Sequence, residues 1–184
     1  MKKSLIAIIV VIVVVLGSLV STYNGMVTMN ENVTSKWSQV DNQLQRRSDL
    51  IPNLVNTVKG YAAHEAGVFK SVADARSKLA GATTVNEKAA ANGELSNALS
   101  RLLAISENYP QLKANQNFAQ LQDELAGTEN RLAVARKDYN DAAQQYNTKI
   151  KSFPTSLFAG MFGFSPRDYF KTDEAAKTAP KVSF

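Results

Sequence analysis

The one histidine of the chain is followed directly by a glutamate, and this pair begins a motif that is common in zinc peptidases. In that motif a second histidine stands three residues after the glutamate, so that two imidazoles on one helix face bind the same ion. The pair here is His64-Glu65, and position 68 is a valine. Because the chain has a single histidine and no cysteine, multi-histidine sites, cysteine-rich zinc sites and thiolate chemistry are excluded. We therefore predict no catalytic residue, no metal ligand and no cofactor.

Charged residues nevertheless gather close to the apolar positions of the central region. These candidates are Arg46, Arg47, Asp49, His64, Glu65 and Arg76. They can form a half-buried ion-pair network that fixes the register of neighbouring helices, or the arginines can bind an anionic ligand. We favour the structural network, because structural ion pairs perturb charges just as catalytic sites do and need no ligand.

The formal net charge of +5 comes from scattered residues and includes Lys2 and Lys3. A surface that binds nucleic acid shows lysine and arginine clustered in a stripe, with aromatic residues between them. The sequence has no such stripe. We predict neither a nucleic-acid partner nor a small-molecule substrate.

The first stretch of the chain decides where these residues are placed. Leu5 to Val20 is apolar apart from Gly17 and Ser18, and the next charged residue is Glu31. A helix needs about 20 apolar residues to cross a hydrocarbon core of about 30 Å. A cleaved signal peptide is the alternative, but no Ala-x-Ala cleavage site lies near Gly17 and Ser18. We predict a signal-anchor that is retained in the bilayer.

The charges beside this span predict its orientation. Lys2 and Lys3 precede it, whereas Tyr23 to Asn30 is uncharged. Positive residues beside a first span tend to stay cytoplasmic. We therefore expect a single-pass membrane protein, with its N-terminus in the cytoplasm and the remaining chain outside.

From Met26 onward the apolar residues recur with the spacing of helices and without the alternation of strands. A further helix is predicted from about 85 to 109, with Thr84 and Glu87 as its cap and Pro110 after its end. Other stripes lie at 26–44 and between 52 and 79. The clearest stripe has a 3-4 spacing, and its members are Phe118, Leu121, Leu125, Thr128, Leu132, Ala135, Tyr139, Ala142 and Tyr146.

The junction between the first two stripes is ambiguous, because the 3-4 spacing passes straight through Pro52. One helix can continue through the proline at a cost of about 3 kcal/mol. Alternatively the chain turns near Ser48, and Ser48 or Asp49 caps a new helix that has Pro52 in its first turn. The periodicity by itself favours neither.

The four stripes must bury against one another, because isolated helices gain little stability from propensity. Helices of this length joined by short loops favour an antiparallel up-and-down four-helix bundle. We therefore predict an all-α fold in three parts. These are a transmembrane helix at 1–25, the bundle at 26–151, and an aromatic-rich segment with a polar tail at 152–184.

The segment after the fourth stripe holds candidate membrane-interface residues, which are Phe153, Leu157, Phe158, Met161, Phe162 and Phe164. They can form a cap that folds over the end of the bundle. Because the fourth helix returns toward the membrane, they can also lie at the lipid surface beside Lys149 and Lys151. Both interpretations stand. The polar stretch from Thr172 onward is expected to be loose.

Several blocks of residues, in a fixed order, resemble the signature of the LemA family. They lie at 37–55, 58–65, 75–76, 109–114, 129–136, 139–140, 146–147 and 153–154. The resemblance implies a four-helix bundle of bromodomain-like topology behind one transmembrane helix, and hence a turn near Ser48. It offers no agreed catalytic residues. It also implies a bacterial membrane protein; some members are encoded beside a membrane-bound zinc peptidase, and one branch belongs to magnetosome membrane formation.

Together these patterns predict a non-enzymatic scaffold or interaction module of the cell envelope. It would contact the bilayer through Leu5 to Val20 and bind other envelope proteins or further copies of itself. An adaptor or regulator of a membrane-bound peptidase is the alternative, and it rests on the family context alone. A hydrolase is disfavoured, because one histidine and no cysteine leave few ways to build a nucleophile and its base.

Overall fold

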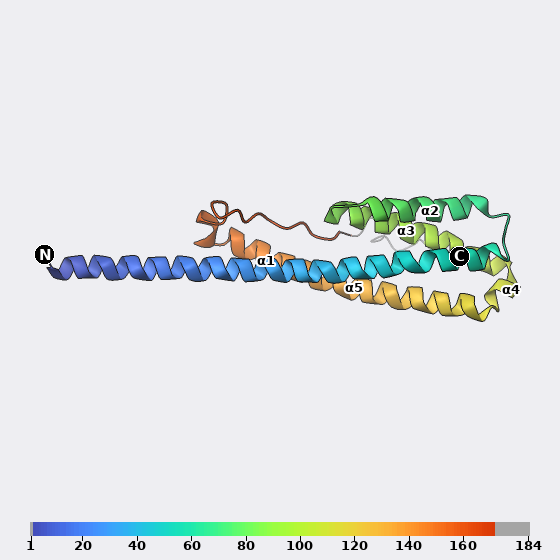
Figure 1. Cartoon of the computed structure of the whole chain (residues 1–184), viewed down its shortest axis with the longest axis horizontal. Helices are drawn as coiled ribbons and strands as arrows, with labels where there is room; N and C mark the ends of the chain where they lie inside the picture. Colours follow the sequence, from blue (N-terminus) through green and yellow to red (C-terminus); the bar gives the residue numbers. More distant parts are fainter. Residues whose placement is uncertain (1, 172–184) are drawn as a thin grey trace, which may run out of the picture.

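The computed structural model describes residues 2–171, and this part of the chain is helical without strands (Figure 1). Its α-helices are α1 (Lys2–Lys59), α2 (Ala66–Gly81), α3 (Val85–Ile105), α4 (Pro110–Lys113) and α5 (Gln116–Lys151). Short 3₁₀ turns, η1 (Ser106–Asn108) and η2 (Thr155–Leu157), follow α3 and α5. The predicted all-α class is confirmed. The stretch from Thr172, which we expected to be loose, lies outside the described residues.

Helix α1 is one unbroken helix of 58 residues. Its first part stands apart from the rest of the molecule, and its apolar side chains between Leu5 and Leu16 are exposed (Figure 1). The helix is long and apolar enough to cross a membrane. It continues past residue 25 without a turn, so the same helix enters the domain that follows.

Helix α5 packs antiparallel along the second part of α1. Trp37 lies against Tyr139, with ring centroids 5.2 Å apart, and further along the pair Arg46 meets Glu124. The buried apolar side chains of α1 are Met26, Val33, Val40, Leu44, Ile51, Leu54 and Val58. The stripe predicted on α5 is confirmed as the buried face of that helix, with Leu121 partly buried.

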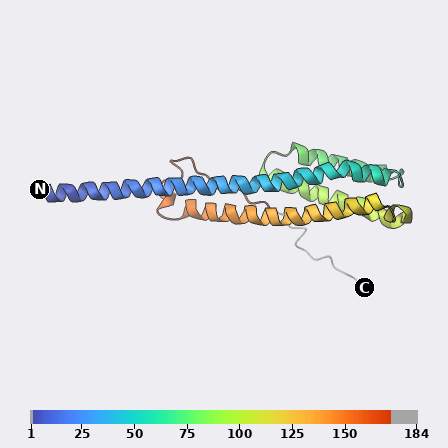
Figure 2. The same ribbon diagram turned by 60° about the horizontal axis from the view of Figure 1, so that its bottom comes forward.

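Helices α2 and α3 form a hairpin that lies on the part of α1 farther from the N-terminus (Figures 1 and 2). The predicted cap of α3 is confirmed: Thr84 Oγ1 accepts from the Glu87 backbone N–H at 3.2 Å, and Glu87 Oε2 accepts from the Thr84 backbone N–H at 2.9 Å. This reciprocal pair satisfies amides that the first helical turn leaves free. It fixes where α3 begins.

The turn near Ser48 that the resemblance implied is wrong, because α1 passes through Pro52 and ends at Lys59. Proline has no N–H, so the carbonyl of Ser48, four residues earlier, loses its partner within the helix. Arg76 Nε on α2 donates to that carbonyl at 3.0 Å. A neighbouring helix therefore satisfies the acceptor that the proline leaves free. The chain reverses later, in the link at 60–65.

Candidate functional site

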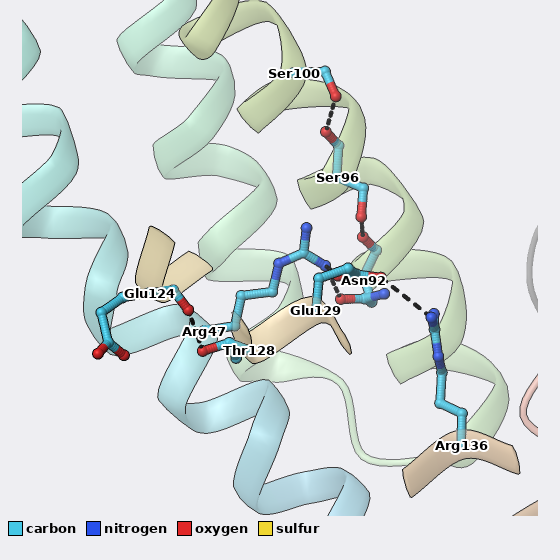
Figure 3. Close-up of polar contacts among 8 residues, drawn as sticks. All are labelled: Arg47, Asn92, Ser96, Ser100, Glu124, Thr128, Glu129 and Arg136. Carbon is cyan, nitrogen blue, oxygen red and sulfur yellow. Dashed lines mark hydrogen bonds and ion pairs between the residues drawn. The ribbon is translucent and has the colours of Figure 1, made fainter. Parts of the chain in front are cut away.

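The most buried charge of the domain is the guanidinium of Arg47 on α1 (Figure 3). Its Nη1 donates to Asn92 Oδ1 on α3 at 2.7 Å and lies 2.8 Å from Glu129 Oε2 on α5. The contact with Glu129 is an ion pair and not a directed hydrogen bond. Glu129 Oε1 in turn accepts from Arg136 at 3.2 Å. We call these four residues the Arg47 cluster; it joins α1, α3 and α5.

In the Arg47 cluster the charge of Glu129 partly offsets the cost of burying the Arg47 guanidinium. Burial lowers the pKa of Arg47, the negative charge of Glu129 opposes that effect, and Arg136 adds a smaller lowering. An arginine stays protonated despite such a shift. With one guanidinium nitrogen already held by Asn92 and facing Glu129, the geometry favours a structural role over anion binding.

The other predicted network residues do not join this cluster. Arg46 points outward and pairs with Glu124 at 2.9 Å, both side chains being half exposed. Asp49 accepts from Gln45 on its own helix at 2.9 Å. His64 is exposed and Glu65 is half-buried, and both lie in the link before α2. Arg76 reaches α1 through the Ser48 carbonyl.

The sequence pattern did not identify Asn92 and Glu129, which contact Arg47, or Arg136, which donates to Glu129. Asn92 stands three residues before Leu95, on the apolar stripe of α3, and is itself buried. A polar residue on such a stripe signals a buried hydrogen bond, because an unpaired amide there is costly. Glu129 is adjacent to the buried Thr128 and carried no comparable signal.

Two asparagines of α5, each of which follows a tyrosine, hold the chain at 165–171. Asn147 donates to the Arg167 carbonyl and accepts from its N–H, both at 2.8 Å. Asn140 makes the same two contacts with Phe170, at 3.0 and 2.8 Å. Seven helical residues rise about 10.5 Å and three extended residues span about 10 Å, so the two asparagines match the two backbone sites. We call residues 165–171 the strap.

The strap also packs on the Trp37–Tyr139 pair. Burial raises the pKa of Tyr139, whose hydroxyl donates to the Asp168 carbonyl at 2.7 Å. Phe170 is buried, with its ring centroid 6.3 Å from that of Trp37. Arg167 reaches back to Asn30 on α1 through two hydrogen bonds of 2.9 and 3.0 Å. The strap thus ties α5 to α1.

The predicted membrane-interface residues form the loop between α5 and the strap, which we call the aromatic loop (Phe153–Phe164). Tyr23 of α1 contacts Phe162 and Phe164, with ring centroids 5.3 and 5.6 Å apart. Phe158 and Phe164 are half-buried, whereas the remaining four candidates are exposed. Gly163 has a φ of 77°, the left-handed region that favours glycine. There the chain turns so that the Phe164 N–H bonds the Ala159 carbonyl at 2.9 Å.

A groove of about 640 Å³ lies between the end of α1 and α2. Val55 and Phe69 give it apolar walls, and Lys59, Lys70 and Arg76 stand at its edges. A second groove, of about 520 Å³, lies on the face shared by α1 and α5 and includes Val134. Neither contains the Arg47 cluster. Between residues 2 and 171, no group of three histidine, aspartate or glutamate side chains could hold a metal ion.

Comparisons with known proteins agree with the blocks of residues noted in the sequence. The family model described as the LemA family matches residues 36–184. Magnetosome protein MamQ 2 of Paramagnetospirillum magneticum is 30% identical over 193 residues, which cover 91% of this chain and 71% of the relative. Magnetosome protein MamQ of Magnetospirillum gryphiswaldense is 29% identical with the same coverage. These names indicate no catalytic activity.

The match begins at Lys36, just before the first block at Trp37, and includes every later block through Phe153-Pro154. It covers most of the chain, and the relatives extend the similarity over nine-tenths of it. The resemblance inferred from the residues is therefore confirmed, and the chain belongs to the LemA family.

Proposed function

We propose that the chain is a non-enzymatic, membrane-anchored scaffold or protein-interaction module of the bacterial cell envelope. The observation that carries this proposal is the continuity of α1, which runs from the apolar stretch into the domain as one helix of 58 residues. At 1.5 Å per residue it is roughly 87 Å long. A scaffold must present its surface at a defined height and angle, and a shared helix supports this better than a flexible linker does.

The proposal takes the domain as a four-helix bundle of bromodomain-like topology, built from α1, α2, α3 and α5. The antiparallel α1–α5 pair and the α2–α3 hairpin support it. So do the polar links between the pairs, from Arg47 to Asn92 and from Arg76 to the Ser48 carbonyl.

The surroundings of the charged and titratable side chains support the non-enzymatic part of the proposal. Arg47 is held by Asn92 and Glu129, and the single histidine lies exposed in the link at 60–65. A catalytic site brings a nucleophile or acid–base pair together in a pocket with shifted pKa values. The first groove is lined by apolar side chains with lysine and arginine and has no acidic residue, and the second is lined mainly by asparagine and glutamine side chains.

The orientation that we propose has the N-terminus in the cytoplasm and the domain outside it, in the inner membrane. Lys2 and Lys3 before the apolar stretch support this. Alkaline phosphatase folds only outside the cytoplasm, so a fusion after Phe184 should be active. An inactive phosphatase, together with an active cytoplasmic reporter at the same point, would reverse the topology.

The scaffold role is tested by photo-crosslinking in intact cells from exposed positions of the two grooves. Lys70 and Val134 suit this, because their side chains are exposed, and the buried Leu132 is a matched control beside Val134. A ladder of homomers, or crosslinks to several envelope proteins, supports the scaffold. A single peptidase partner favours the alternative, an adaptor or regulator. No protein crosslink at either exposed position would contradict both.

A further inference from the structure

We propose that the aromatic loop is a second membrane-binding site, which inserts Phe153, Leu157 and Met161 into the leaflet where the α1 span ends. The lipid acyl chains and glycerol region of that leaflet are its ligand. The inference rests on the proposed span of α1. It does not depend on what the domain binds.

The height of the aromatic loop along α1 is the first argument. The uncharged stretch from Leu5 to Thr22 rises about 27 Å as a helix, close to the hydrocarbon thickness of about 30 Å. Tyr23 follows directly and packs on Phe162 and Phe164. A tyrosine at the end of a span belongs to the interface. The loop that touches it therefore lies at the same level.

The exposure of the loop's side chains is the second argument. Phe153 and Met161 are each 81% exposed and Leu157 is 60% exposed. Elsewhere in the domain the aromatic rings of Phe118, Tyr139 and Phe170 are buried. Large apolar side chains gathered on one exposed loop mark a surface that another apolar phase covers. The nearest apolar phase is the one that surrounds the first part of α1.

One side of the aromatic loop packs on the end of the α1–α5 pair, and the other side is free to contact lipid. Phe158 and Phe164 are half-buried and Ala159 is buried, so one side closes the end of the α1–α5 pair. The exposed phenylalanine, leucine and methionine form the other side. The cap interpretation and the lipid interpretation of this segment are therefore compatible.

The charges around the loop are the third argument. No aspartate or glutamate occurs from Ala142 to Arg167, whereas Lys149, Lys151 and Arg167 are cationic. On α1 the first acidic residue is Glu31, well past the contact with Tyr23. Carboxylates would be repelled by anionic headgroups, and lysines are attracted to them. This end of the domain is suited to an anionic bilayer surface.

The loop is also held in place before any lipid arrives. Arg167 is bonded to Asn30 of α1 and to Asn147 of α5, so the chain is fixed directly after the loop. Lys151 ends α5 directly before it. A preorganised site loses little conformational entropy on binding, and more of the transfer free energy of its side chains is retained.

The test uses the full chain in vesicles of phosphatidylethanolamine and phosphatidylglycerol. Because the chain has no cysteine, single-cysteine variants can carry an environment-sensitive NBD fluorophore at one position each. Met161→Cys and Phe153→Cys report on the loop, Val13→Cys on the span, and Val134→Cys on an exposed site far along α5. The vesicles contain, or lack, lipids with a spin-label quencher at two depths, near the top of the acyl chain for the loop and near its end for Val13.

We expect the quencher lipid to reduce the fluorescence at both loop positions by about half or more, with a blue-shifted emission, as for a side chain inserted in the interface. Val134→Cys should show neither effect. Quenching at Val13→Cys without quenching at either loop position would overturn this inference and leave the span intact. No quenching at Val13→Cys would overturn the span itself.

A protein that covers the loop gives a different result. A blue shift at Met161→Cys and Phe153→Cys that the quencher lipid does not reduce would mean that a second copy of the chain, and not lipid, covers these residues. That outcome also overturns the inference. The two loop variants check each other, because both replace exposed side chains and an effect of one on folding would not be shared by the other.

Discussion

Arg46 and Arg47 are neighbours in the sequence with opposite surroundings. The Arg46 pair with Glu124 is half exposed, whereas Arg47 is buried against Asn92 and Glu129. We expect Arg47→Met to lower the free energy of unfolding by about 1–3 kcal/mol, because it leaves the buried Asn92 oxygen without its donor. Arg46→Met, the matched control, should change it by less than about 1 kcal/mol. Urea denaturation of both variants measures the difference, and equal losses would contradict a structural role for Arg47.

The contact between Arg76 and the Ser48 carbonyl predicts a specific coupling with Pro52. We expect Arg76→Met to lower the free energy of unfolding by about 1–3 kcal/mol, because it leaves a buried acceptor unsatisfied. In a Pro52→Ala background residue 52 has an N–H that can bond the same carbonyl, so Arg76→Met should be less destabilising there. A double-mutant cycle by urea denaturation measures this coupling. An equal loss in both backgrounds would show that Arg76 acts through other contacts.

For single residues, the sequence indicates which side chains are buried or bonded better than it indicates which residues they contact. Arg47 and Arg76 drew attention because each stands near an apolar stripe. Their partners lie on other helices, and which residues meet across helices depends on packing that a single helix pattern does not contain. Asp49 and Glu65 are close to the arginines in the chain, but the structure gives Arg47 its carboxylate from Glu129.

Among the elements, helix α3 has an N-terminal cap whose contribution to stability depends on pH. Hydrogen bonds from the Thr84 and Thr83 backbones lower the pKa of Glu87 to about 2. A folded-state pKa below the unfolded value means that the stabilisation is fully present above the ordinary glutamate pKa and is lost as the pH falls toward 2.

Glu87→Gln should therefore be less stable than the parent chain at neutral pH, and the difference should close as the pH falls to about 2. Thermal unfolding followed by circular dichroism across this pH range measures the gap between the two proteins. A gap that is as large at pH 2 as at neutral pH would show that the Glu87 charge has no part in the cap.

The strap depends on two side chains of α5, so its attachment can be tested directly. Asn140→Ala and Asn147→Ala each remove a donor and an acceptor from the strap backbone. We expect the amide of Phe170 or Arg167, respectively, to exchange with deuterium about tenfold faster, as for the loss of about 1.4 kcal/mol of local stability. Gln144→Ala, an exposed change between them, should leave both amides protected. Unchanged exchange in the asparagine variants would mean that other contacts hold the strap.

Two elements show what the sequence could and could not predict. The cap of α3 was predicted because Thr84 and Glu87 are local and need no tertiary contact. The course of α1 was not, because a helix through Pro52 leaves a carbonyl free, and only Arg76 from α2 satisfies it. The residues near Ser48 fit either a turn or a continuous helix, and the contact that accompanies the continuous helix comes from α2.

For the whole molecule, the proposed span and the continuity of α1 together set the distance that we expect between the domain and the bilayer. Inserting seven helix-forming residues, two of them charged, such as Glu-Ala-Ala-Ala-Lys-Ala-Ala, after Thr22 raises the domain by about 10.5 Å and nearly keeps its rotation. We expect lipid quenching at Met161→Cys to fall to the level seen at Val134→Cys. Quenching that persists would mean that the loop reaches lipid independently of α1.

If α1 spans the bilayer as proposed, its unbroken course also makes the molecule a lever that pivots in the membrane. About 36 residues of the helix extend beyond Tyr23, an arm of roughly 54 Å. A span tilts by about 20° on average and adjusts its tilt to the thickness of the membrane. Such a tilt moves the far end of the arm sideways by roughly 18 Å. In the proposed arrangement a change in bilayer thickness shifts the α2–α3 hairpin sideways, because no joint in α1 separates it from the membrane.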